Sequence, residues 1–140
     1  MIKTVSLPLA TLLLAALPQL RLAAQDTPES LLLKANEAKR EAQGLALRAA
    51  GAFDRRGGLH FIAGRVKESV ADFDMAVKLD PGREPWHWRR GISYYYVGKF
   101  EEGKKQFEGY QTVDSSDVEN ATWRYLCMAR ISGTDAASKA

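Results

Sequence analysis

Residues 53–114 read FDRRGGLHFIAGRVKESVADFDMAVKLDPGREPWHWRRGISYYYVGKFEEGKKQFEGYQTVD, and the second half of this stretch repeats the first. The triplet Arg55-Arg56-Gly57 returns as Arg89-Arg90-Gly91, which sets a spacing of 34 residues. Periods of this length are typical of helix–turn–helix units that stack side by side. The stretch therefore predicts an all-α fold. The same spacing relates these further pairs: Gly64 and Gly98, Phe73 and Phe107, Asp80 and Asp114, His60 and Tyr94, and Phe61 and Tyr95.

Glycine and proline mark the expected breaks between helices. Gly64-Arg65 and Gly98-Lys99 are predicted turns, and Asp80-Pro81-Gly82 ends a helix because proline cannot continue its hydrogen-bond ladder. A first helix is expected to begin near Ser30, and Gly44 leaves open whether this helix joins the next one. The remaining predicted helices span residues 49–63, 66–79, 84–97, 100–113 and 117–131, with Pro85 in an opening turn and Ser116 or Asp117 capping the last helix.

The repeated stretch resembles the tetratricopeptide repeat, an antiparallel helix pair that stacks into a right-handed superhelix. Residues 70–81 are very similar to the family's second helix and its ending, and the likeness extends over about residues 50–131. The resemblance implies a short right-handed helical solenoid of two repeats, closed by capping helices at residues 31–42 and 117–131. The residues that match family positions are Phe53, Gly57, Gly64, Phe73, Ala76 and Pro81 in the first copy, and Gly91, Tyr94, Gly98 and Phe107 in the second.

Glycines at repeat spacing indicate a packing or turn requirement, since glycine in a helix costs about 0.5–1 kcal/mol relative to alanine. We expect Gly57 and Gly91 to permit the close approach of the two helices of a pair. Phe73 and Phe107 are then expected to fill the gap between neighbouring helices. The second copy is the less regular one, because Gly103 replaces the family's usual alanine.

A weaker likeness concerns residues 117–130. This segment resembles the final helix of bacterial envelope repeat lipoproteins of the new-lipoprotein-I type. The resemblance implies an adaptor that gathers cell-wall hydrolases and proteases.

The first two dozen residues have the layout of a secretory signal peptide. Lys3 forms a short positive region, residues 5–17 are apolar, and the small residue Ala24 precedes the expected cleavage point. The apolar run is shorter than the ~20 residues that span a bilayer, so membrane attachment is expected only if the segment is not cleaved. No cysteine lies near this point, so the sequence contains no bacterial lipidation signal there. We expect a periplasmic or secreted protein.

We expect the rest of the chain to comprise a leader with an N-terminal capping helix at residues 25–48, a repeat domain at 49–131 and a disordered tail at 132–140. Removing the signal segment leaves 18 basic and 17 acidic residues from the original 20 and 17, so the net charge gives little support for nucleic-acid binding. Cys127 is the only cysteine, which excludes an internal disulfide framework and favours a buried thiol.

The most aromatic segment of the chain lies in the first helix of the second copy. The first helices of such repeats line a concave groove where partners bind, and Trp, Tyr and Arg are the residues that anchor interfaces. Tyr94 and Trp86 are expected to serve inter-repeat packing instead. The predicted groove residues are Trp88, Arg89, Ile92, Tyr95 and Tyr96, with Trp123 completing the same face.

Some ligand classes are disfavoured. A clamp for a peptide carboxylate uses Lys and Asn in the groove, whereas the matching first-copy residues are Asp54 and Gly58. Arg56 and Arg90 favour structural ion pairs with a carboxylate such as Asp72 over recognition of an anionic ligand.

Nothing in the sequence indicates catalysis, a cofactor or a metal site. His60 and His87 are the only histidines, and no Cys/His pair has metal-ligand spacing. The sequence predicts a non-catalytic protein-interaction module that binds a protein or peptide in its groove. A self-assembling structural protein of the envelope, or a carrier of a small ligand or glycan, remain the alternatives.

Overall fold

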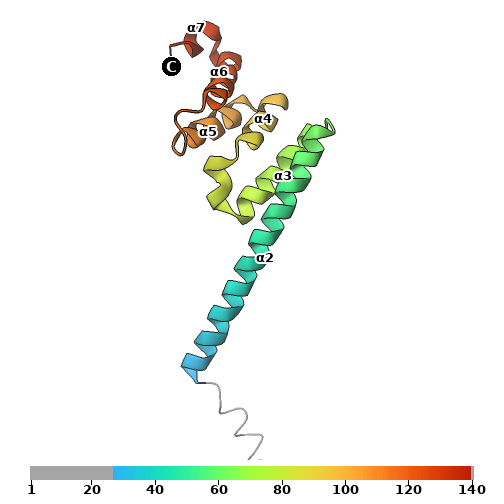
Figure 1. Cartoon of the computed structure of the whole chain (residues 1–140), viewed down its shortest axis with the longest axis vertical. Helices are drawn as coiled ribbons and strands as arrows, with labels where there is room; N and C mark the ends of the chain where they lie inside the picture. Colours follow the sequence, from blue (N-terminus) through green and yellow to red (C-terminus); the bar gives the residue numbers. More distant parts are fainter. Residues whose placement is uncertain (1–26, 140) are drawn as a thin grey trace, which may run out of the picture. The chain divides into compact units, whose positions relative to one another are not determined.

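The computed structural model describes residues 27–139, and the expected signal segment at residues 1–24 lies outside this range. Every regular element within it is a helix (Figure 1), and no helix there is long and apolar enough to cross a membrane. The described residues fall into two units divided between Ala42 and Gln43. The elements are α2 (Pro28–Ile62), α3 (Val66–Leu79), the 3₁₀ helix η1 (Pro81–Trp86), α4 (Trp88–Tyr96), α5 (Phe100–Gln111), α6 (Val118–Ser132) and α7 (Thr134–Ala137).

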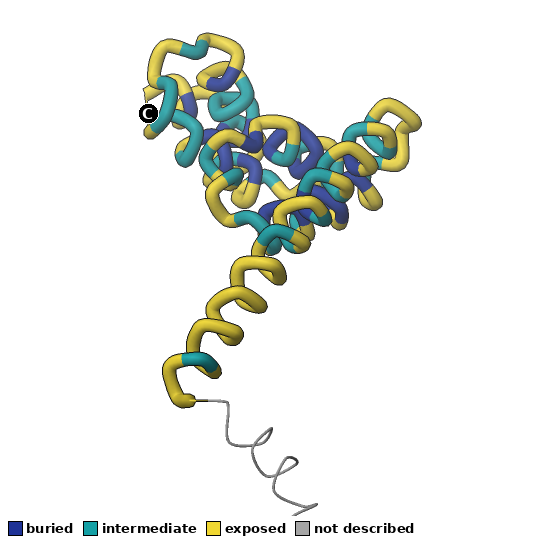
Figure 2. The backbone as a smooth tube through the Cα atoms, turned by 60° about the horizontal axis from the view of Figure 1, so that its bottom comes forward, coloured by how far each residue is buried: buried dark blue, intermediate teal, exposed yellow. Residues whose placement is uncertain are grey.

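The first unit contains the opening turns of α2. The helix starts at Pro28, where the Ser30 N–H donates to Thr27 Oγ1 at 3.2 Å and Thr27 thus caps the first turn. Every residue from 31 to 43 is exposed, including three consecutive leucines that begin at Leu31 (Figure 2). Gly44 does not interrupt the helix, so the two predicted helices are one. The capping role expected for residues 31–42 stays a prediction.

The second helix of the first repeat agrees with its predicted bounds. α3 spans Val66–Leu79 because a turn precedes it and a proline follows it. Gly64 makes the turn with φ of +72°, a conformation that side chains with a Cβ rarely adopt. Gly98 repeats this geometry between α4 and α5 with φ of +79°.

The start of the second repeat differs from the prediction. A single helix was expected from residue 84, but η1 comes first and α4 begins only at Trp88. Pro85 disfavours an α conformation at Glu84 and has no N–H to donate. The segment instead forms 3₁₀-type hydrogen bonds, from the Arg83 N–H to Asp80 O at 3.1 Å and from the His87 N–H to Glu84 O at 3.3 Å.

The C-terminal part contains α5, α6 and α7. Asp117 is the N-cap of α6, and its Oδ1 accepts the Asn120 N–H at 3.1 Å, so this alternative of the predicted cap is confirmed. Residues 132–140 were expected to be a disordered tail, yet α7 lies within them. Gly133, with φ of +87°, lets the chain turn after α6, and Ala137 becomes buried.

Buried aromatic rings hold the repeats together. A Cβ placed on Gly57 would lie 2.8 Å from the Phe73 ring, and both rings that recur at repeat spacing, Phe73 and Phe107, are fully buried. Phe107 forms a core cluster with Ile92 and Cys127. The chain is therefore an all-α protein with a tetratricopeptide-like helical fold, as predicted.

Candidate functional site

An apolar cavity of about 160 Å³ opens between the end of α2, α3 and α4. The exposed Trp88 side chain lies at its rim, and the buried Phe73 and Ile92 side chains contribute to its wall. Gly58 leaves room on the α2 side of the cavity, because a Cβ at this position would lie only 3.4 Å from Arg89 Nη1. The complete lining consists of Gly58, Phe61, Ile62, Phe73, Trp88, Arg89 and Ile92.

An aromatic cluster adjoins this cavity through Phe61. Tyr95 meets Trp123 of α6 edge to face at 5.5 Å between ring centroids, and it meets Phe100 in the same way at 5.4 Å. Tyr96 is 60% exposed and contacts Phe61 at 5.9 Å. We call Tyr95, Tyr96 and Trp123 the aromatic cluster.

The six predicted groove residues therefore fall into two neighbouring sets. Trp88, Arg89 and Ile92 line the apolar cavity, and Ile92 is a buried wall residue rather than an exposed contact. The other three form the aromatic cluster. Whether they bind a partner stays a prediction.

Tyr94 and Trp86 were both expected to pack between the repeats, and the structure confirms this only for Tyr94. Tyr94 is buried, and its hydroxyl donates to Asp74. Trp86 is 58% exposed, so the prediction that it packs between repeats is wrong. It lies on η1, which replaces the first turn of the predicted helix, and one edge of its ring faces Tyr110 at 6.4 Å.

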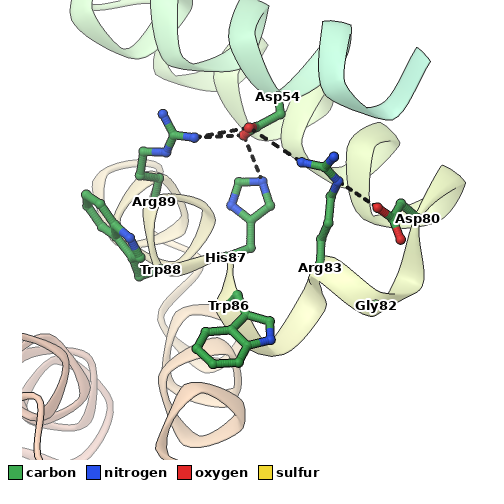
Figure 3. A pocket seen from close by; sticks show the side chains of 8 residues that line it. All are labelled: Asp54, Asp80, Gly82, Arg83, Trp86, His87, Trp88 and Arg89. Carbon is green, nitrogen blue, oxygen red and sulfur yellow. Dashed lines mark hydrogen bonds and ion pairs between the residues drawn. The ribbon is translucent and has the colours of Figure 1, made fainter. Parts of the chain in front are cut away.

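A cluster of charged side chains surrounds Asp54 on α2 (Figure 3). Arg89 and Arg83 approach this carboxylate from opposite sides, at 3.0 and 3.7 Å. Arg83 also donates to Asp80 at 2.8 Å. Two carboxylates thus face two guanidinium groups, so these charges are mutually neutralised.

His87 points toward Asp54 from below, between the two arginines (Figure 3). Its Nε2 lies 3.3 Å from Asp54 Oδ1, too poorly aligned for a hydrogen bond, and this nitrogen has no other partner. Burial lowers the pKa of His87 to about 4, and the positive charges of Arg89 and Arg90 act in the same direction, while Asp54 opposes them. The imidazole is neutral at pH 7.

Arginine pairs link the helices at repeat spacing. Arg56 donates to both carboxylate oxygens of Asp72, at 2.6 and 2.7 Å, and the predicted structural ion pair is confirmed. One repeat later, Arg90 donates to Gln106 at 2.9 Å and to Asp74 at 2.7 Å. These guanidinium groups are engaged within the fold and do not form a free anion site.

The thiol of Cys127 belongs to the core cluster of the fold. Cys127 is fully buried, and burial raises the pKa of its thiol to about 11, so the prediction of a buried cysteine is confirmed. Within residues 27–139, no group of His, Cys, Asp and Glu side chains could hold a metal ion.

From the sequence, Asp54 served only to argue against a carboxylate clamp, and His87 served only to argue against a metal site. A signal was nevertheless present, because Asp54 and Trp88 are 34 residues apart and so occupy the same repeat position. Residues on either side of Trp88 were therefore candidates for contact with Asp54.

The fold and these sites define the class as a tetratricopeptide-like repeat protein. The chain is 32% identical over 54 residues to a Haemophilus influenzae protein named lipoprotein NlpI homolog. The match takes in 39% of this chain but 17% of the relative, so the chain spans a small part of that protein. No known protein family matches the chain, and no solved structure matches it. The likeness supports a tetratricopeptide-like relationship, in agreement with the fold.

Proposed function

We propose that this protein is a non-catalytic, exported interaction module that holds a segment of a partner protein against the apolar cavity and the aromatic cluster. The apolar cavity is the observation that most supports this function. It offers a recess for one apolar side chain, and its rim is formed by an exposed tryptophan. Export is supported by the layout of residues 1–24 and by the name of the relative, which is a lipoprotein.

The exposed apolar side chains around the cavity favour a protein partner. Ile62 is 83% exposed at the end of α2, and Tyr96 and Trp88 are also exposed. Removing such surface from water is favourable by about 25 cal/mol per Å² as a transfer free energy, and the ordering costs of association are subtracted from that gain. Tryptophan and tyrosine are the residues that most often dominate binding energy at interfaces. A partner segment that covers these three side chains would remove an apolar surface from water.

The test compares two tryptophan variants of the full chain as baits in envelope extract. Trp88→Ala removes the rim of the cavity. Trp86→Ala is the matched control, because Trp86 is also exposed but does not line the cavity. Both variants must first show unchanged helicity and unchanged thermal unfolding.

We expect a partner that the wild-type chain and Trp86→Ala retain and that Trp88→Ala loses. The loss should be reproduced with the purified partner. If Trp88→Ala retained every partner, the proposal that a partner binds at the apolar cavity would be wrong. Self-association of the chain at micromolar concentration, or a tryptophan fluorescence response to glycan fragments, would favour the structural or carrier alternative.

A further inference from the structure

An open depression adjoins the apolar cavity at the end of α4. Its volume is about 510 Å³, and Arg65 and Lys67 belong to its lining. We call these two residues the basic pair. Tyr96 lines the depression as well, and its ring meets the cavity residue Phe61 at 5.9 Å between centroids. Two aromatic rings therefore join the cavity to the depression.

The basic pair carries charge that the fold does not neutralise. Both side chains are exposed, and neither forms an ion pair with a carboxylate of residues 27–139. Glu68 is the other charged residue of the lining, so the depression retains an excess of one positive charge. An acidic group on a bound segment would be attracted to it.

A chain of contacts holds the Arg65 guanidinium in place. Its Nε donates to His60 Nδ1 at 2.9 Å, which places the proton of the imidazole on Nε2. This Nε2 lies 3.7 Å from Asp72, and Asp72 is itself held by two hydrogen bonds from Arg56. The bond to His60 uses Nε alone, and the N–H groups on Arg65 Nη1 and Nη2 have no hydrogen bond within the described residues. The guanidinium is thus oriented while most of its donors stay available for a ligand.

The repeat architecture does not require the basic pair. The 34-residue spacing relates Arg65 to Lys99 and Lys67 to Glu101. Lys99 lies over the Tyr94 ring at 5.6 Å, and Glu101 is one of the acidic residues in the first turn of α5. An acidic residue suits this helix position, because the N-terminus of a helix carries a partial positive charge. Lys67 in the first turn of α3 is unfavourable for the same reason, which indicates a requirement outside the helix.

The other end of the apolar cavity has no such excess of charge. Trp88 and Tyr96 are the first and last residues of α4. Arg89 lines the cavity beside Trp88, and its guanidinium pairs with Asp54 at 3.0 Å. A carboxylate on a bound segment would therefore be attracted toward Tyr96 and not toward Trp88. The surface thus combines a recess for one apolar side chain with positive charge on one side of it.

We propose that the partner segment carries an acidic side chain close to the apolar residue that enters the cavity, and that its carboxylate pairs with Arg65 and Lys67 beside Tyr96. The fork of the guanidinium matches the two oxygens of a carboxylate. Because the basic pair is exposed, this contact sets the orientation and the choice of partner more than the affinity. The site differs from a carboxylate clamp, whose positions are occupied here by Asp54 and Gly58. This inference rests on the proposed function, since both partner residues belong to one segment.

The first test titrates blocked pentapeptides into the full chain while the Trp88 indole N–H signal is followed by NMR. The acidic peptide is acetyl-Asp-Ala-Leu-Ala-Asp-amide. Its analogues carry asparagine or lysine in place of aspartate, or alanine in place of leucine. We expect the acidic peptide to bind about 5-fold more tightly than the asparagine analogue, and the lysine analogue to bind most weakly of these three. The preference should disappear in about 1 M salt, where the Debye length falls to about 3 Å.

Each other result of this titration overturns a defined part of the argument. If the leucine peptides bind equally well whatever their charge, the apolar cavity stands and the acidic preference is wrong. If the acidic peptide binds equally well with and without leucine, the cavity is wrong as the anchor of the segment. If no peptide shifts the Trp88 signal at millimolar concentration, both proposals are wrong.

The second test removes the basic pair. Arg65→Gln/Lys67→Gln should weaken binding of the acidic peptide about 5-fold and leave the asparagine analogue unaffected. Lys39→Gln/Arg40→Gln is the matched control, because it removes the same two charges from exposed positions that line neither the cavity nor the depression. An equal effect of both variants would reduce the preference to overall net charge and overturn the site. Lys67→Glu is a second variant that introduces the residue of the second repeat, so it should keep the fold and abolish the preference.

The purified partner separates the failure of this inference from the failure of the proposed function. If Trp88→Ala loses the partner and Arg65→Gln/Lys67→Gln retains it at full affinity, binding at the apolar cavity stands and the acidic contact is wrong. If replacement of one acidic partner residue by lysine weakens binding to the wild-type chain, and Lys67→Glu restores it, the inference is supported. If neither Trp88→Ala nor the loss of the basic pair affects the partner, both proposals are wrong.

Discussion

Gly91 and Phe107 are so close that a Cβ on Gly91 would lie 2.6 Å from the Cζ atom of the phenyl ring. The first repeat has the same relationship between Gly57 and Phe73, at 2.8 Å. Both rings are fully buried. The absence of a side chain on each glycine is therefore what brings the two helices of a pair together.

Gly91→Ala should destabilise the protein by about 1–3 kcal/mol, the usual cost of overpacking a core. Alanine improves helix propensity by up to about 1 kcal/mol, but the clash with a buried ring outweighs that gain. Urea unfolding followed by circular dichroism measures the change. Gly109→Ala is the control, since nothing lies within 4 Å of its added Cβ, and it should leave stability unchanged or raised. A Gly91→Ala protein as stable as the control would show that the helices separate without cost.

The resemblance to the repeat family predicted the close approach at these glycines and the placement of the two phenylalanines, and turn residues predicted the bounds of α3. Short-range chemistry explains that success, because Gly64 and Pro81 mark both ends of the helix regardless of its neighbours. The prediction was wrong where two local effects competed. Pro85 was tolerated in principle at a helix start, but the 3₁₀ bonds of η1 were preferred.

The site was only partly predictable. Aromatic composition identified Trp88 and Tyr95, but it did not separate the exposed Trp88 from the buried Ile92. The position of the Arg65 guanidinium depends on its hydrogen bond to His60 Nδ1, which the repeat spacing does not reveal. The direction in which a side chain turns depends on its neighbours in the folded protein, so a sequence pattern does not predict it.

Asp72→Asn should reduce stability at neutral pH and have a smaller effect in acid. Hydrogen bonds from Arg56 lower the pKa of Asp72, and burial opposes them. A depressed carboxyl pKa stabilises the fold above the unfolded value of about 3.9, and this contribution is lost as the pH falls through the folded pKa. Urea midpoints of the two proteins, measured from pH 7 to pH 2.5, should therefore converge below about pH 4. A gap that is constant across the whole range would contradict the charge-assisted pair.

His87 should produce a separate acid destabilisation at higher pH. Its folded pKa of about 4 lies below the unfolded value of about 6.5, so the unfolded chain binds the proton first as the pH falls. The contribution of the neutral His87 side chain to the free energy of unfolding is fully present above pH 6.5, and it decreases by roughly 3 kcal/mol between pH 6.5 and 4. His87→Phe should abolish this slope while retaining an aromatic ring against Phe73, which His87 meets at 4.6 Å.

The control for His87 is His60→Gln, which removes the other histidine of the chain. The wild-type slope between pH 6.5 and 4 should persist in this variant. Thermal unfolding at half-unit pH steps distinguishes the outcomes. If the slope disappeared in His60→Gln and persisted in His87→Phe, the assignment of this pH dependence to His87 would be wrong.

Cys127 should react with a thiol reagent only when the protein opens. Its side chain is fully buried, and burial raises the thiol pKa to about 11, so at pH 8 both access and thiolate formation are suppressed. We expect the reaction with an aromatic disulfide reagent to be at least about 1,000-fold slower in native buffer than in urea, as for a group exposed by global unfolding. Cys127→Ser/Ser115→Cys moves the only thiol to an exposed position and should react rapidly in both solvents. Rapid native reaction of the wild-type thiol would mean that α6 separates from α5 far more often than this packing allows.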